Sequence, residues 1–586
     1  MIIFGKLYVY LCYDNYNVYI DMKKWIFISL GIIAAVAATF AIVKLCSNGD
    51  ASDEQVPQRN ISDNLVVAYV NIDQLATKGA FDQHIDASNR KMFATVMSSA
   101  IAERSHGDHA SNIITDLSTA GLDIKEPAYA YFDEMENLVV AAKVKDVANV
   151  DKTFALLSFI LEQDGGEPLT IEHDGENRII RLDNDVITAY NEKHIVVATN
   201  SSQEVSKEVV IDALRRPIND LSIFGDSDIA LYANYYRGMT LLREVLENTK
   251  AEYELMAAED PYYDDSIVEI DEILAMIDKY AAYVKEDANA LISLTFDPGR
   301  VTLNATVNGI ETSEFEDIAK RTNNKHLEYI SEDAAIIANI GMNGKRYAEI
   351  IDLILSSKSF TESEYNTFEV NMIAGIACDA IESIDGDLTL AVENIEGKYD
   401  SYYDSFYDEY HANASLQSVS ASAIIDVRDD YIISNLGQFI GGFLHRQDNR
   451  HYYGSFSGLD ISIGQDDNVF HAGINTTYTL KHDSAADAEW FPYVENSLSY
   501  VVVDIDNLMD YSYIKAANKM LMNDMDSVTR DVYAQYIELC DYAYISQPNL
   551  TEMEVVITLK DDDTNALKQI VDVIMPVLMS EIMINM

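Results

Sequence analysis

The sequence predicts an α+β protein with mainly antiparallel sheets, packed helices and two duplicated halves, preceded by one N-terminal transmembrane or signal helix. Three observations predict this architecture. Short apolar runs alternate with helical patterns, several neighbouring runs are joined by hairpin turns, and one apolar motif occurs four times along the 586 residues. Strands interleaved with helices and joined by hairpins are typical of α+β domains. We therefore expect one half at 64–325 and a second at 326–586.

The repeated motif is a short apolar run that ends in Asn or Asp. Its copies read LVVAYVNIDQL, DIALYANY, DAAIIANI and LSYVVVDIDNL, and the polar residues that end them are Asn71, Asn234, Asn339 and Asp504. Such a run predicts a buried strand. An Asn or Asp just before a helix accepts hydrogen bonds from the free N–H groups of the first turn. We therefore expect each copy to be a strand, an N-cap and a helix, with the polar residues at equivalent strand ends.

The remaining elements follow from period-two and helical patterns. In the first half we expect strands and helices in the order strand 128–132, strand 138–144, helix 151–161, strands 169–171, 178–182, 186–190 and 194–198, and helix 203–215. In the second half we expect helix 346–356, strands 387–392 and 421–425, helix 431–443, strands 459–463, 469–480 and 553–559, and helix 564–582.

The charge balance limits the classes of partner. The chain carries 41 basic and 97 acidic residues, a formal net charge of −56 and a pI near 4.3. Phosphate backbones and anionic lipid surfaces are repelled by such a surface. We therefore expect no nucleic-acid partner, and we interpret the acidic side chains as the solvated surface of a protein outside the cytoplasm.

A membrane anchor is expected near the N-terminus. Residues 25–43 form an uncharged apolar stretch of the length that crosses a bilayer as a helix, which we place at about 25–45. Lys23 and Lys24 precede it and an acidic stretch follows, so the positive-inside rule places the N-terminus in the cytoplasm. The segment 1–46 is thus a leader and anchor, with a possible true start at Met22, and 47–63 is a polar linker.

Lipidation at Cys46 is the alternative to an uncleaved helix. Cys46 is followed by Ser-Asn-Gly-Asp, which resembles the start of a mature bacterial lipoprotein. The preceding Val43-Lys44-Leu45 is a poor lipobox, so we favour the retained helix. The bulk of the chain then lies in the periplasm or at the cell surface.

The segment after the first strand resembles a known family. LVVAYVNIDQL, then GLDIKEPAYAYF, then a hairpin and a helix after a lysine-started membrane signal, are similar to uncharacterised cell-envelope proteins of Bacteroidota that share a domain of unknown function. Gly121, Asp123 and Pro127 match the family's Gly-x-Asp-x-x-x-Pro segment. The resemblance implies an envelope location and supplies no catalytic residues.

The most unusual composition lies in KYDSYYDSFYDEYH at 398–411. Tyrosine rings beside carboxylates can stack on sugars and bond their hydroxyls, and carboxylates can hold Ca²⁺. We favour a solvated insertion over both. The candidate ligand contacts are Tyr402, Tyr403, Asp404, Tyr407 and Asp408.

Two histidine pairs are candidate metal ligands. His106 and His109 flank Asp108, and His445 precedes His451 by six residues. Neither pair has an identifiable complete ligand set, and His-Glu-x-x-His is absent from the sequence. We therefore interpret these residues as incidental loop histidines and expect no metal and no cofactor.

The sequence contains no complete catalytic motif. Ser512 and Lys515 match Ser-x-x-Lys without its companion motifs, Phe456 stands where a nucleophile elbow needs Ser, and no phosphate-binding loop is present. Cys378 and Cys540 are expected to be buried free thiols.

The sequence therefore predicts a membrane-tethered extracytoplasmic protein, a non-catalytic binding or scaffold protein of the cell envelope. Its expected partners are the membrane, through the N-terminal helix, and an envelope protein or a glycan. The alternative is a glycan-binding or glycan-hydrolysing protein, for which the many carboxylates do not single out an acid and a base.

Overall fold

The computed structural model describes residues 59–80, 104–133, 135–163, 166–183, 185–200, 203–257, 263–313, 315–356, 368–404, 409–525 and 527–585. The predicted membrane helix and Cys46 lie outside these ranges, as does most of the predicted linker. Within these ranges no helix is long and apolar enough to cross a membrane.

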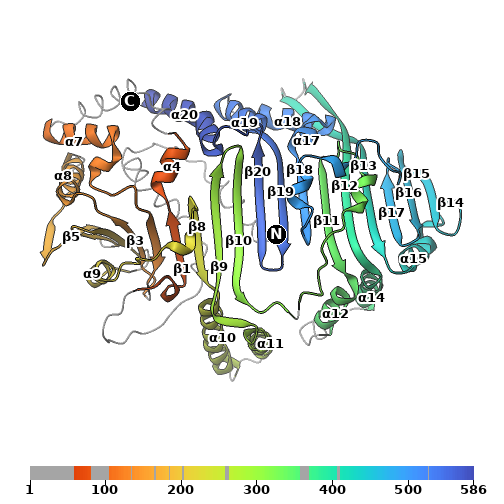
Figure 1. Ribbon diagram of the computed structural model, residues 1–586, viewed down its shortest axis with the longest axis horizontal. Helices are drawn as coiled ribbons and strands as arrows, with labels where there is room; N and C mark the ends of the chain where they lie inside the picture. The colour runs from red at the N-terminus through yellow and green to blue at the C-terminus, as the bar shows by residue number, and fades with distance from the viewer. Residues whose placement is uncertain are drawn as a thin grey trace.

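The described strands form one 20-stranded sheet in which all strand pairs are antiparallel (Figure 1). The first ten strands form one side of it. From the outer edge inward they are β4 (Ile171–Asp174), β5 (Asn177–Asp183), β6 (Val186–Tyr190), β7 (His194–Thr199), β3 (Leu138–Lys143), β2 (Ala128–Phe132), β1 (Val66–Val70), β8 (Ile229–Asn234), β9 (Val284–Asp297) and β10 (Arg300–Ile310).

The other ten strands follow the corresponding order from the opposite edge. They are β14 (His445–Arg446), β15 (His451–Phe456), β16 (Leu459–Asp466), β17 (Val469–Ile474), β13 (Glu409–Val427), β12 (Ile384–Asp404), β11 (Ile336–Asn343), β18 (Ser499–Asp504), β19 (Cys540–Asn549) and β20 (Glu552–Leu559). The two sides meet where β10 pairs with β20.

Helices complete the α+β architecture that the sequence predicted. They are α4 (Ile72–Lys78), α7 (Arg104–Thr115), α8 (Val147–Gln163), α9 (Lys207–Arg215), α10 (Tyr235–Ala257), α11 (Tyr263–Ala281), α12 (Gly344–Leu355), α14 (Phe368–Glu382), α15 (Tyr431–Ile440), α16 (Phe491–Val494), α17 (Ile505–Asp510), α18 (Ser512–Asp524), α19 (Ser527–Leu539) and α20 (Ala566–Asn585). In Figure 1, α17 to α20 lie along the upper end of the central strands, and α10, α11, α12 and α14 lie along the lower end.

Three strands next to the outer edge strand of each side form a wing. We call β5–β7 the first wing and β15–β17 the second wing. One face of the first wing packs under α8, in a core that contains Phe154 and Tyr190, and the corresponding face of the second wing packs under α15, with Ile433, Tyr452 and Phe470. The candidate site lies on the other face of the second wing.

Three of the four predicted caps are confirmed. Asn71 accepts from Gln74 N (3.1 Å) at the start of α4, and Asp504 accepts from Asn507 N (2.8 Å) at the start of α17. Asn234 accepts from Arg237 N (2.9 Å), where α10 begins.

The fourth cap prediction is wrong. Asn339 lies inside β11 and is only 2% exposed, because β11 continues to Asn343 before α12 begins. The N–H of Asn71 donates to Asp228 O, and the N–H of Gly341 donates to Leu498 O in the corresponding place. Gly341, and not Asn339, therefore holds the register position of Asn71.

The expected Tyr- and Asp-rich insertion is also corrected. The predicted strands 387–392 and 421–425 are parts of the much longer β12 and β13, whose backbones still pair Tyr402 with His411 and Asp404 with Glu409. Alternation along both strands lets the hairpin continue beyond the neighbouring β11. Tyr402, Tyr403 and Asp404 thus end β12, while Tyr407 and Asp408 lie outside the described residues.

Candidate metal centre

The second wing brings two histidines to one face of the sheet. In the pairing register His451 of β15 lies opposite Gly464 of β16, and Gly464 lies opposite His471 of β17. Residues directly opposite each other in antiparallel strands project to the same face. A Cβ atom on Gly464 would come within 2.5 Å of His451 Cδ2 and 2.6 Å of His471 Cε1. The two imidazoles therefore lean over a position that only glycine leaves open.

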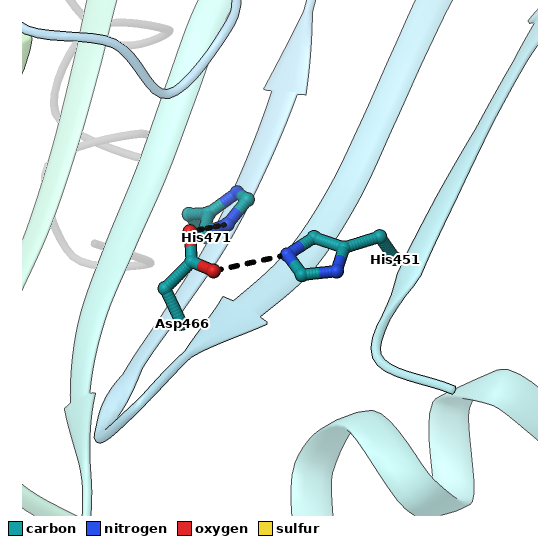
Figure 2. Close-up of side chains that lie close together, drawn as sticks. All are labelled: His451, Asp466 and His471. Carbon is teal, nitrogen blue, oxygen red and sulfur yellow. Dashed lines mark hydrogen bonds and ion pairs between the residues drawn. The ribbon is translucent and has the colours of Figure 1, made fainter. Parts of the chain in front are cut away.

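A carboxylate completes the group. Asp466 lies two residues beyond Gly464 on the same strand, so its side chain projects to the same face. One of its oxygens is 3.2 Å from His451 Nε2 and the other is 3.4 Å from His471 Nε2 (Figure 2). One ligand atom from each of the three residues can be chosen so that all lie within 4.8 Å of one another.

His451 is oriented by a second carboxylate. Its Nδ1 lies 2.9 Å from both oxygens of Asp448, three residues earlier in the chain. A histidine that donates its Nδ1–H to a carboxylate keeps the lone pair of Nε2 free for a metal and has a more basic Nε2. The Asp448–His451 pair therefore presents Nε2 toward Asp466.

The His471 imidazole is buried and stacked on a tyrosine ring, which favours its neutral form. The residue is 8% exposed, and its ring stacks on that of Tyr478, with ring centroids 4.3 Å apart. Burial lowers the pKa of His471, and the nearby His451 acts in the same direction while Asp466 opposes them. The imidazole is thus neutral near pH 7. Within the described part of the chain its buried Nε2 meets no hydrogen-bond geometry, and its contact with the Asp466 oxygen 3.4 Å away is an ion pair only when the imidazole is protonated.

The geometry is suited to a divalent transition metal. Zinc binds His N and Asp O at about 2.0–2.2 Å, which sets ligand atoms about 3.3 Å apart in a tetrahedron. The two His–Asp distances in the second wing, each to a different Asp466 oxygen, are close to this spacing, and the three ligand atoms lie within 4.8 Å of one another. Two histidines and one carboxylate leave at least one coordination position open, and it faces water because the Asp466 side chain is 60% exposed. The group can hold zinc or a similar ion with a water ligand.

Among the described residues, neither histidine pair singled out in the sequence forms a ligand group of its own. His445 lies on β14 with its ring 5.9 Å from that of Tyr453, and it contributes no atom to the group. His106 stacks on Phe159, whereas His109 Nε2 lies 3.0 Å from Thr153 Oγ1. His451 is therefore a candidate ligand with Asp466 and His471, and not with its sequence neighbour His445.

Sequence reasoning missed Asp466 and His471. The available signal was a histidine inside the apolar strand sequence VFHAGI, where a polar side chain needs a partner. Two short hairpins in succession, β15–β16 and β16–β17, then bring it back beside His451. The predicted free thiols are confirmed for Cys378 and Cys540, of which Cys378 is buried and Cys540 is partly buried.

A second polar cluster lies in the first half and is internally satisfied. A cavity of about 500 Å³ is lined by Asp73, Lys78, Asp226 and Asp297, among others. Beside it the buried Asp228 accepts from Lys78 Nζ and from Phe296 N, each at 2.7 Å. These contacts pair the carboxylate without a ligand, so the cluster stabilises the junction of α4 and β9.

The comparisons with known proteins concern the whole chain and not this site. A family model described as a domain of unknown function, DUF4836, matches residues 59–567. No curated protein matches the chain. Among solved structures, crystal form IV of TP0453 is similar at 10% identity, 43% of this chain, 78% of that chain and a TM-score of 0.20. Crystal form I is similar at 11% identity, 44% of this chain, 80% of that chain and the same TM-score, a likeness too low to carry an argument.

Proposed function

The chain belongs to the DUF4836 family, a domain of unknown function. We propose that it is a membrane-tethered extracytoplasmic protein and, from the geometry of the second wing, that it binds a divalent transition-metal ion. The ligands are His451, Asp466 and His471. The observation that carries the proposal is the buried Nε2 of His471, which has no hydrogen bond and faces a carboxylate already shared with an oriented His451.

The location outside the cytoplasm rests on sequence. The uncharged stretch 25–43 behind Lys23 and Lys24 supports a tether with the bulk outside, and lipidation of Cys46 is the alternative tether. The net charge of −56 favours an envelope protein or a glycan as partner over nucleic acid. The matching order of the ten strands on each side supports two duplicated halves, at 64–325 and 326–586.

The role is binding and not catalysis. The Asp466 and His451 side chains of the ligand group are 60% and 29% exposed, and that of His471 is 10% exposed. Catalytic metals act in a shaped, water-excluding site. An ion on this open surface would instead be the bound ligand itself or would stabilise the strands around it.

Calorimetric titration of the detergent-extracted full chain with Zn²⁺ at pH 7 tests the proposal. We expect one ion per chain, and we expect His451→Ala, His471→Ala and Asp466→Asn each to weaken binding by about 100-fold or more, since each removes a ligand. Asp448→Ala should cost about 10–100-fold because it removes only the orienting carboxylate.

The matched control is His445→Ala, which removes an exposed imidazole from the adjacent strand and should leave the affinity unchanged. Zinc binding that survives all three ligand substitutions, or that is absent from the unmodified chain, would refute the site.

Glycan binding by the end of the β12–β13 hairpin is a second candidate function. α18 supports the hairpin, since Ser512 Oγ accepts from Gly397 N (2.9 Å) and Asn523 Nδ2 donates to the Tyr399 hydroxyl (3.0 Å). A supported, Tyr-rich strand end is suited to stacking on sugars. On a glycan array, binding that is lost in Tyr402→Ala plus Tyr407→Ala would support this function, and an array without any bound glycan would exclude it.

A further inference from the structure

The two wings are equivalent by register but differ in chemistry. Counting outward from β1, the cross-strand row through Tyr69 and Tyr129 reaches Val196, Ala189 and Ile179 in the first wing. Counting outward from β11, the corresponding row reaches the metal-centre residues of the second wing, in the order His471, Gly464, His451. The two candidate histidine ligands thus occupy positions that are apolar in the other wing, where Val196 and Ile179 stand.

A helix covers those apolar positions in the first wing. α9 follows β7 and places Val209, Val210 and Ala213 in the same buried cluster as Ile179, Ala189 and Val196. Burying these side chains contributes about 25 cal/mol for each Å² of apolar surface removed from water. The helix therefore holds the three strands of the first wing together from one face.

The second wing has no such helix among its described residues. Between β17 and α16 the chain forms only the short 3-10 helix Ala485–Asp487, and Tyr478 alone stacks on His471. Tyr478 in turn stacks on Tyr329, with centroids 4.2 Å apart, so it covers the inner strand β17. His451 on the outer strand β15 remains partly exposed.

The outer strand is also weakly held at its other edge. β15 pairs with β14 through only two residue pairs, His445 with Tyr453 and Arg446 with Tyr452. Strands at the edge of a sheet open at low free-energy cost when few buried contacts hold them. Besides their ladder and the α15 side, β15 and β16 are joined on the metal-centre face by the contact of His451 Nε2 with Asp466, at 3.2 Å.

We propose that the bound ion takes the place of α9 and makes the order of the second wing depend on metal. This inference rests on the proposed metal binding. One ligand comes from each of β15, β16 and β17, so a single ion joins all three strands on the face that lacks a helix. Because binding needs the three strands in register, the free energy of metal binding stabilises that register. Water fills the open coordination position on the exposed side.

Hydrogen–deuterium exchange of the detergent-extracted full chain, with EDTA or with Zn²⁺, tests the inference. Zn²⁺ should slow amide exchange in peptides from residues 451–474 by about tenfold or more, because local opening then requires loss of the ion. Peptides from residues 177–199, the first wing, are the internal control and should exchange at the same rate with and without Zn²⁺. Asp466→Asn should abolish the difference, and His445→Ala should keep it.

The outcomes separate the two proposals. Stoichiometric Zn²⁺ binding by calorimetry with unchanged exchange in the second wing would overturn the structural role and leave the binding intact. Absence of binding would overturn both. Equal slowing in both wings would also overturn the structural role, since the described residues of the first wing contain no ligand group. A variant that misfolds is recognised by faster exchange in the first wing, and His451→Ala then replaces Asp466→Asn.

Discussion

The two halves carry different cores on the same backbone register. In the first half the row through β8, β1 and β2 consists of Ala230, Tyr69 and Tyr129, and Tyr69 stacks on Phe224 with centroids 4.7 Å apart. In the second half the corresponding residues of β18, β11 and β12 are Tyr500, Asn339 and Thr389. One centre is aromatic, and the other is a buried polar network.

The members of the polar network form hydrogen bonds with one another. Asn339 Nδ2 donates to Asn324 Oδ1 (3.1 Å), and Thr389 Oγ1 donates to Asn339 Oδ1 (3.1 Å). The buried Asp387 accepts from the N–H groups of Asn323 and Asn324 at 3.0 and 2.8 Å. Buried polar groups are tolerated only when they have such partners, and a complete network specifies one arrangement of the core.

The difference shows that the duplicated strand order does not require one kind of core. Either an aromatic stack or a hydrogen-bonded polar network can fill the same row. A single residue moved from one half to the other loses the partners that its own half supplies. Substitutions that transplant or break one member test this directly.

The largest effect is expected when a residue of the polar centre is placed in the aromatic one. Tyr69→Asn removes a ring that is 5% exposed and buries an amide without the partners of Asn339, so we expect a loss of about 4 kcal/mol in the free energy of unfolding. Tyr69→Phe keeps the ring and should cost about 1 kcal/mol. Urea unfolding measures both, and equal costs for the two variants would contradict the aromatic assignment.

The next effect concerns the carboxylate of the network. Asp387→Ala removes the acceptor of the Asn323 N–H and leaves the buried Asn324 N–H without an acceptor, at an expected cost of about 3 kcal/mol. Asp400→Ala, on an exposed part of the same strand, is the control and should change stability by less than about 0.5 kcal/mol. A cost for Asp387→Ala as small as that of the control would mean that the network adds nothing.

A smaller effect distinguishes network from cap. Asn339→Ala should cost about 2 kcal/mol because it leaves buried partners unsatisfied. Asn71→Ala and Asp504→Ala each remove one capping bond and should cost about 1 kcal/mol. Thermal unfolding of the three variants ranks them, and a loss for Asn339→Ala equal to or below those of the caps would restore the capping interpretation.

The smallest expected effects are on pH dependence, and they have opposite signs. Burial raises the pKa of Asp426, but hydrogen bonds from His326, the Asp387 N–H and Asn323 outweigh it, so this pKa lies below its ordinary value of 3.8. Its contribution to stability is present above pH 3.8 and is lost as the pH falls through the lowered pKa. Asp426→Asn should therefore reduce the acid sensitivity of unfolding.

Asp504 behaves in the opposite way. Burial raises its pKa above 3.8, with Asp506 and Asp333 acting in the same direction against the N–H groups that it caps. Its contribution is full below pH 3.8 and is lost as the pH rises through the raised pKa. Asp504→Asn keeps the cap and should gain stability relative to the native protein as the pH rises from 3.8 to 7. Unfolding curves in which both variants shift in the same direction with pH would contradict these assignments.

The α+β class and most hairpins could be predicted from sequence because period-two alternation and turn residues are local. The residues that meet across strands in the two cores could not be predicted in this way. Asn339 follows an apolar run as Asn71 does, and only the pairing of Gly341 with Leu498 places it inside a strand. His451 is closest in sequence to His445, but sheet register brings it to His471. Contacts across three strands depend on pairing, which no local pattern contains.

The position of β1 has a mechanical consequence for a chain held by its N-terminus. β1 lies inside the sheet, paired to β2 on one side and to β8 on the other, and does not lie at an edge. A pull through the residues before Arg59 would load both ladders along their length, so that their hydrogen bonds resist together in shear. A tether on an edge strand would instead open one bond at a time. Attachment at that end would suit a protein that must stay folded under tension.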